Sequence, residues 1–162
     1  MSDSPDRRRI LTALALGVSP AVIAARPARA QVDAGYRVVP SKLPFAKLEE
    51  AVAAAIKAAG MNAVTRASAS DGARARGVTI RGDIVFGVFR NDFAVRMLAA
   101  NVDAAIEAPI RLHLVEEADG TTSIRYHLPS AVFGQYEGDA IKALGRELDP
   151  IFAKIVAEAV AG

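Results

Sequence analysis

The sequence contains no cysteine and no tryptophan, and its aromatic side chains are limited to six phenylalanines and three tyrosines. The absence of cysteine excludes disulfide bonds, thiolate metal sites, iron–sulfur clusters, cysteine nucleophiles and a lipid-modified cysteine. With so few aromatic side chains, Ala, Val, Leu and Ile must fill the core, which is typical of helices packed closely on a sheet. The apolar fraction of 52% is ordinary for a globular domain, so we expect the core alone to hold the protein together.

The sequence also lacks the motifs that mark common enzyme classes. It contains no nucleophile elbow, phosphate-binding glycine loop, zinc-binding helix motif or dinucleotide fingerprint. The acidic pairs Glu116/Glu117 and Glu147/Asp149 are close in sequence, but such neighbours point apart on a strand or helix and make poor catalytic dyads. Distant residues can assemble a catalytic site in a folded protein. Nothing in the sequence marks one, and we expect a binding or interaction module rather than an enzyme.

The positive net charge of +2 is concentrated at the N-terminus. Residues 1–30 contain five arginines and two aspartates, whereas the remaining chain carries 15 basic and 16 acidic side chains. A body so close to neutral lacks the positive surface that phosphate backbones require. We therefore expect no nucleic-acid partner.

Residues 1–30 have the three parts of a cleavable export signal. A cluster of arginines is followed by an apolar run over 10–25 and then by small residues. Ala28 and Ala30 fit an A-x-A cleavage site, which makes Gln31 the first residue of the mature protein. Signal peptidase is therefore an expected partner, and the mature protein is expected to be periplasmic or secreted.

Arg7 and Arg8 are followed by one further residue and then by two large apolar residues. This pattern resembles the twin-arginine export motif, so we expect the twin-arginine machinery to carry the protein. The alternative is a transmembrane or amphipathic helix that the mature protein keeps. The apolar run is shorter than the roughly 18–20 residues of a membrane span, and Pro20 and Pro27 interrupt the segment.

Helical spacing of apolar residues predicts four helices. They cover residues 44–59, 91–101, 137–148 and 150–161. Pro44 and Gly60 are typical of the first position of a helix and of the position after its end. We expect Asn91 to cap the second helix. Its buried residues are expected to be Phe93, Met97 and Leu98. Asp149 and Pro150 are expected to kink the chain or to start a new helix, with Asp149 as its cap.

Alternation and turn residues predict the strands. They are expected at 36–39, at 62–68, at 84–89 and in a hairpin within 110–128. The stretch 84–89 is apolar on both faces, as a strand covered on both sides would be, whereas 70–82 is rich in glycine and charge and is expected to be a loop. The order β-α-β-β-α-β-β-α predicts an α+β two-layer sandwich with a mostly antiparallel sheet of about five strands. It forms one domain over 36–162, after a short extension at 31–35.

The hairpin alternates apolar and polar residues on both of its strands. The apolar ones all have even numbers, namely Leu112, Leu114, Ile124, Tyr126 and Leu128. Because paired residues point to the same side of a sheet, a two-residue turn would set apolar side chains against polar ones. A three-residue turn at 119–121 avoids this, and Gly120 supplies the left-handed conformation that such turns need. With this turn, His113 lies directly opposite His127 on the face away from Leu112.

The stretch from Phe86 to Tyr136 resembles the core of the domain of unknown function 302 family. The matching positions are Phe89, Asn91, Met97, Asn101, Pro109, Val115, Glu116, Gly120, Tyr126 and Pro129. Asp92 and Val102 stand where the family usually has prolines, and Asp71-Gly72 stands where it often has Asp-His, so no role of that histidine is carried over. The resemblance covers about residues 36–160 and implies a compact α+β fold, bacterial distribution and no established activity.

The two histidines are one candidate site. Two imidazoles across a strand pair can bind a Cu, Zn or Ni ion or face a haem. Arg111 and Arg125 share that face with His113 and His127 and favour an anion or a solvated surface instead. We expect no cofactor, and the alternative is a protein that binds a metal ion or haem through His113 and His127.

Arginines outnumber acidic residues between positions 66 and 96. Such an excess can hold an anionic ligand or a lipid head group, although charge runs are usually solvated. The ligand-binding candidates are Arg74, Arg76, Arg90, Arg111 and Arg125. We expect an exported domain that binds a small apolar or anionic ligand, in a groove between sheet and helices, or that interacts with a partner. A third possibility is a structural homo-oligomer that pairs through its sheet.

Overall fold

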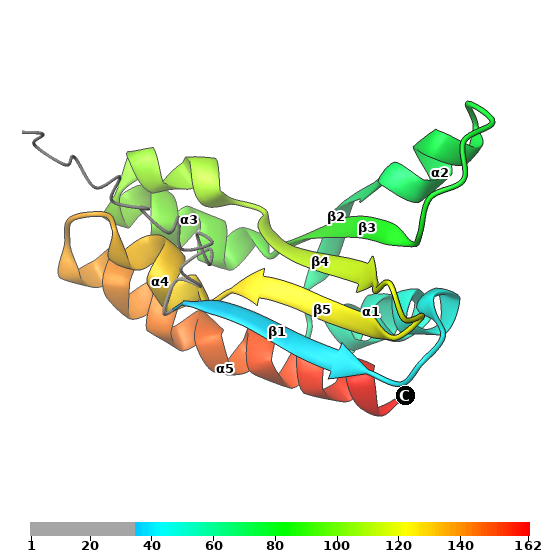
Figure 1. Ribbon diagram of the computed structural model, residues 1–162. Helices are drawn as coiled ribbons and strands as arrows, with labels where there is room; N and C mark the ends of the chain where they lie inside the picture. Colours follow the sequence, from blue (N-terminus) through cyan, green and yellow to red (C-terminus); the bar gives the residue numbers. More distant parts are fainter. Residues whose placement is uncertain (1–34) are drawn as a thin grey trace, which may run out of the picture. The chain divides into compact units, whose positions relative to one another are not determined.

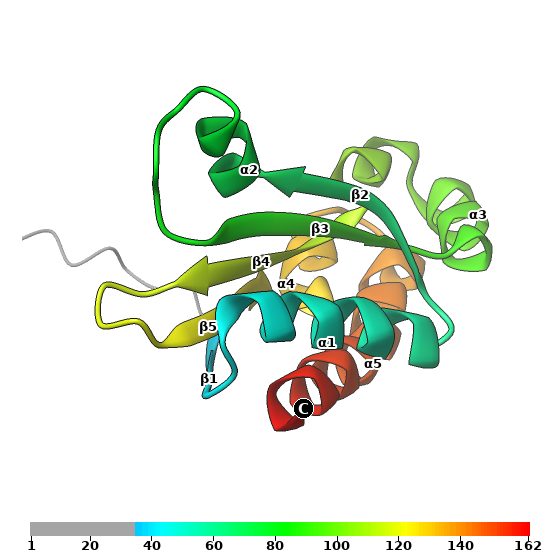
Figure 2. The same ribbon diagram turned by 90° about the vertical axis from the view of Figure 1, so that its right-hand side faces the viewer.

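Five antiparallel strands form one sheet in the computed structural model, which describes residues 35–162 (Figure 1). The strand order is β1-β5-β4-β3-β2. In chain order the elements are β1 Tyr36–Ser41, α1 Phe45–Ala58, β2 Asn62–Ser68, α2 Ala69–Arg74, β3 Asp83–Phe89, α3 Asn91–Ala100, the 3-10 helix η1 Val102–Glu107, β4 Ile110–Glu116, β5 Thr122–His127, α4 Pro129–Gly134 and α5 Asp139–Ala161. Helices α1 and α5 lie side by side on one face of the sheet (Figure 2), so the predicted two-layer α+β sandwich is confirmed.

The core lies between the sheet and the helices α1 and α5. Leu112, Leu114 and Ile124 have no exposed surface, as the predicted alternation requires. The expectation that the strand at 84–89 is covered on both sides is wrong. Its even-numbered side chains are buried, whereas Val85 and Phe89 are only half-buried on the face that α1 and α5 leave uncovered.

The hairpin turn has the predicted length but begins one residue early. Its three-residue loop covers 118–120, and it is closed by the Glu117 N–H, which donates to the Thr121 carbonyl at 2.7 Å. Gly120 has φ 84°, the left-handed conformation expected of it. The carboxylate of Asp119 accepts hydrogen bonds from the backbone N–H and the hydroxyl of Thr121, at 3.0 and 2.6 Å. This side-chain turn selects the earlier loop.

A shift of the turn by one residue moves every cross-strand partner by two positions. Because two positions are one full period of a strand, every side chain keeps its predicted face. The partner of His113 changes, however, from His127 to Arg125. The prediction that the two histidines are cross-strand neighbours is therefore wrong.

Helix α2 occupies part of the region expected to be a loop. Its cap is Ser68, whose hydroxyl accepts a hydrogen bond from the Asp71 N–H at 3.0 Å. A serine before a short, glycine-containing stretch is a weak signal in sequence, but its oxygen satisfies an amide that would otherwise have no partner. The predicted loop is confirmed only for residues 75–82.

Helix α5 runs without a break through Pro150, so the predicted restart of the helix there is wrong. Asp149 does act as a cap, but for another helix, because its carboxylate accepts a hydrogen bond from the Ser130 N–H of α4 at 2.8 Å. Helix α4 itself was not predicted. Leu148, Phe152 and Ile155 continue one buried stripe across the proline, and this packing holds the helix together there. Within residues 35–162, no helix has the length and apolar character that crossing a membrane requires.

Helix α3 differs from the prediction at its start but ends where expected. Asn91 is its first residue, and its start has no side-chain cap. Phe93 and Met97 are buried as expected, but Leu98 is 47% exposed. Asn101 ends α3, and its side chain accepts a hydrogen bond from the Asp103 N–H at 3.0 Å, which caps η1.

Candidate functional site

The five arginines predicted to bind a ligand lie in separate parts of the domain. Arg74 and Arg76 are at the end of α2, in the segment that projects from the sheet in Figure 1. Arg90 follows β3 at the opposite end of that strand, beside α3. Arg111 and Arg125 lie on the uncovered face of the sheet, on β4 and β5. The fold therefore does not gather these residues into one anion site.

The histidines also have separate surroundings. His113 Nε2 lies 2.8 Å from Asp83 Oδ2, and both side chains are 36% exposed. His127 packs on Tyr36, with ring centroids 5.1 Å apart. Among residues 35–162, no group of three or more His, Asp and Glu side chains is arranged to hold a metal ion.

Arg125 is occupied by a network on the uncovered face. Its Nη2 donates to Glu117 Oε1 at 2.5 Å, and the hydroxyl of Ser123 donates to the same oxygen at 2.6 Å. The hydrogen bonds from Ser123 and Arg125 lower the pKa of the Glu117 carboxyl below its usual value. An ionised Glu117 at neutral pH leaves little free charge on Arg125 for a ligand.

A polar hollow lies where β4 and β5 meet η1 and α4. Arg111, His127, Glu107 and Gln135 are among its lining residues. The hydroxyl of Tyr136 donates to Glu107 Oε1 at 2.8 Å, and this hydrogen bond raises the pKa of Tyr136. The hollow has a volume of about 320 Å³ and brings Arg111 together with the carboxylate of Glu107 in one lining, so its charge is nearly balanced.

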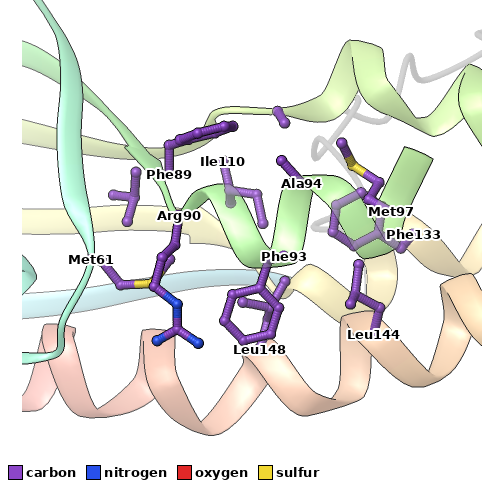
Figure 3. Close-up of a pocket in the computed structure, with 12 residues that line it drawn as sticks. Met61, Phe89, Arg90, Phe93, Ala94, Met97, Ile110, Phe133, Leu144 and Leu148 are labelled. Carbon is purple, nitrogen blue, oxygen red and sulfur yellow. The ribbon is translucent and has the colours of Figure 1, made fainter. Parts of the chain in front are cut away.

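An apolar pocket lies between the end of the sheet, α3 and α5 (Figure 3). Its lining residues come from five elements and the loops beside them: Met61, Val88, Phe89, Arg90, Phe93, Ala94, Met97, Ala108, Ile110, Phe133, Leu144 and Leu148. Its cavity volume is about 30 Å³, room for one or two water molecules. It lies between sheet and helices, where a groove for a ligand was expected.

Arg90 is the only charged residue in this lining. Its guanidinium lies 4.3 Å from the ring centroid of Phe93, and the two side chains lie next to each other in Figure 3. The Arg90 side chain is 33% exposed and forms a two-fold hydrogen-bonded pair with Asp92, at 2.7 and 3.0 Å. These bonds lower the pKa of the Asp92 carboxyl. An arginine thus stands at the solvent-facing edge of an otherwise apolar pocket.

A second arginine lies on the other side of Phe93. The Arg96 guanidinium is 5.4 Å from the Phe93 centroid, and it donates to both carboxylate oxygens of Glu147 on α5. The hydrogen bonds from Arg96 lower the pKa of Glu147. This ion pair links α3 to α5.

The sequence identified Arg90 as a candidate but not the rest of the pocket. Phe93 and Met97 were expected only as core residues, and Met61, Phe133, Leu144 and Leu148 carry no signal of a site. Their common feature, a gap between elements that are distant in sequence, exists only in the fold. Arg7, Arg8 and the cleavage residues Ala28, Ala30 and Gln31 lie outside the residues that the structure describes.

Comparisons with known proteins support the fold. A family model described as "Domain of unknown function DUF302" matches residues 37–159. Among solved structures, the chain is similar to an uncharacterized conserved DUF302 protein from Bacillus stearothermophilus. The TM-score is 0.70 at 18% sequence identity, over 78% of this chain and 98% of that one. At this identity the likeness shows the fold alone. No curated protein matches the chain.

Proposed function

The chain belongs to the family of domain of unknown function DUF302, and from the geometry of its apolar pocket we propose that it binds a small amphiphilic ligand. The flexible side chains of Met61 and Met97 would move aside to admit a short aliphatic or aromatic group, and an anionic head group would lie beside Arg90. The observation that carries this proposal is the combination of a wholly apolar lining with one arginine at its edge. Ligand sites in proteins commonly combine apolar walls with a few polar groups that fix orientation.

Two features of the lining suit an adaptable binding site. Met61 and Met97 contribute flexible, polarisable side chains, which can adjust to ligands of different shape. The partner of Arg90 is a carboxylate that is 57% exposed. An ion pair this exposed is weak, so Arg90 can exchange Asp92 for a ligand anion at small cost.

We expect hexanoate and 1-hexanol to bind in this pocket when titrated by isothermal calorimetry. Ala94 lines the pocket and is half-buried, so Ala94→Phe should fill the space and abolish binding of both. Ala99→Phe is the matched control, because Ala99 lies exposed on the same helix. Arg90→Gln should weaken hexanoate by about tenfold, the loss of a charged hydrogen bond of about 1.5 kcal/mol, and should leave 1-hexanol unchanged.

Two outcomes would contradict the proposed function. If neither compound binds the unmodified protein, the pocket is only a packing gap. If Ala99→Phe reduces binding as much as Ala94→Phe, the compounds bind elsewhere. An equal loss of both compounds in Arg90→Gln would mean that Arg90 supports the pocket wall rather than the head group.

The two alternative functions have less support. A metal or haem site needs His113 and His127 together, but each has its own partner, in Asp83 and Tyr36. Edge-to-edge oligomerisation through the sheet would use β1 and β2. Pro40 removes a donor from β1, and β2 has a bulge between Ala63 and Thr65. Both devices disfavour edge-to-edge pairing.

We further propose that residues 1–30 direct the protein through the twin-arginine route. A reporter that folds before export, fused to residues 1–35, should reach the periplasm. Arg7→Lys/Arg8→Lys should abolish its export, because that route requires the paired guanidinium groups. Arg9→Lys is the control, since it leaves the pair intact. Fractionation of cells measures the result, and export that survives the double substitution would refute the route.

A further inference from the structure

We propose that the segment 74–81 docks the domain on a bilayer of anionic phospholipid. This surface is distinct from the apolar pocket and does not depend on the ligand proposed for it. The segment begins at the end of α2 and continues to the start of β3. It projects away from the sheet in both ribbon views (Figures 1 and 2).

The whole segment is exposed, including its apolar residues. All eight residues from 74 to 81 are classed as exposed. Val78 is 52% exposed and Ile80 is 47% exposed. Neither residue belongs to a helix or a strand. Two large aliphatic side chains exposed in a projecting segment are unfavourable in water, because each leaves apolar surface in contact with solvent. A bilayer surface would remove that surface from water.

The charge around these two side chains is positive. The segment contains Arg74, Arg76 and Arg81 and no acidic residue. Asp71 is shared between Arg74 at 2.7 Å and Arg66 at 2.9 Å, and the Glu116 carboxylate accepts a hydrogen bond from the N–H of Gly82, next to Arg81, at 2.7 Å. Within residues 35–162, the structure gives Arg76 no ion pair, and Arg81 donates only to the Ala118 carbonyl at 3.4 Å. The positive charge is therefore largely available to a partner.

An anionic bilayer fits this combination better than a nucleic acid does. Membrane-binding segments place aliphatic side chains at the acyl boundary and arginines among the head groups. Single-stranded nucleic acids would require aromatic side chains for stacking, and the segment has none. Duplexes would require an extended basic surface, whereas the rest of the chain is nearly neutral.

Another exposed apolar patch, on α3, can be compared with the segment 74–81. Val95 and Leu98 on α3 are as exposed as Val78 and Ile80, at 59% and 47%. They share their helix with Asp92 and Arg96, which offset each other in charge. This patch therefore provides a control of equal apolar character without the positive charge.

The test is co-sedimentation with vesicles of phosphatidylcholine, with and without phosphatidylglycerol. The protein is the chain from Gln31 onward, which contains every element of the sheet and its core, and circular dichroism checks that each variant folds. Binding should require phosphatidylglycerol and should fall as salt is raised. Each arginine near an anionic surface contributes about fivefold in affinity. Arg74→Gln/Arg76→Gln/Arg81→Gln should therefore bind roughly a hundredfold more weakly.

Two matched variants separate the segment from the general surface. Lys142→Gln/Arg146→Gln/Lys154→Gln removes three positive charges from α5 and should change binding by less than the loss of one arginine. Val78→Ser/Ile80→Ser should weaken binding about tenfold, the effect of leaving two aliphatic side chains out of the bilayer. Val95→Ser/Leu98→Ser should leave it unchanged.

Three results would overturn the proposal. One is equal binding to vesicles without phosphatidylglycerol. Another is an equal loss in the α5 charge variant, which would show that only net charge matters. The third is retention of a DNA duplex, but not of vesicles, through Arg74, Arg76 and Arg81, which would make nucleic acid the partner.

Discussion

Ile155→Ala is expected to lower the free energy of unfolding by about 2–5 kcal/mol, the usual cost of truncating a buried isoleucine. Ile155 lies in the middle of the buried stripe of α5 and has no exposed surface. Its removal takes away apolar contacts and leaves a cavity, because the sheet and α1 cannot close completely around a smaller side chain. With no cysteine available for a disulfide, the core is the main source of stability.

The control is the same chemical change at an exposed position. Ile106 is 82% exposed on η1, so Ile106→Ala should change stability by less than about 0.5 kcal/mol. Urea unfolding followed by circular dichroism measures both variants, with the midpoint falling and the slope unchanged for Ile155→Ala. Equal effects at the two positions would mean that α5 does not pack against the sheet as described.

Gly145→Val is expected to cost about 2–3 kcal/mol through overpacking between α4 and α5. A Cβ atom at Gly145 would lie 2.9 Å from the Pro129 carbonyl oxygen and 2.9 Å from the Ser130 Cα. Both are backbone atoms, which cannot rotate away as a flexible side chain could. The two helices would have to separate, which would also break the hydrogen bond from the Ser130 N–H to Asp149.

Gly134→Val tests whether the cost comes from this contact. Gly134 is also helical, but a Cβ placed there meets no atom within 4 Å. Its substitution should be nearly neutral, because valine is no worse than glycine in a helix. Because Leu144 and Phe133 line the apolar pocket beside this contact, Gly145→Val should also weaken hexanoate binding. A Gly145→Val protein as stable as the unmodified one would contradict the close packing of α4 on α5.

The sequence was most informative where one element alone determines the outcome. The strand at 62–68 and the helix over 44–59 were predicted almost to the residue. The spacing of apolar residues and the helix-end residues Pro44 and Gly60 are signals contained within each element. The family resemblance over 36–160 is confirmed by the match over 37–159. The hairpin faces were correct because alternation is a property of each strand.

Most predictions failed where the position of a residue depends on contacts with segments that are distant in sequence. Asp149 was expected to cap its own helix, but Ser130, nineteen residues earlier, takes its carboxylate. The break at Pro150 was wrong for the same reason, since the buried stripe on both sides of it packs against the core. The histidine pair failed for a local reason, because the hydrogen bonds of Asp119 favour a turn that begins one residue earlier.

The sequence by itself determined the α+β class, the family and the face on which each hairpin side chain lies. These depend on periodicity and local turn chemistry, which a short stretch of chain contains in full. Only the tertiary structure decided which residues share a site. Arg90 acquires its place because β3, α3 and α5 leave a gap beside it. Arg74 and Arg76 lie in a projecting segment because α2 turns away from the sheet. Such positions arise from contacts between segments far apart in the chain, and no local pattern contains them.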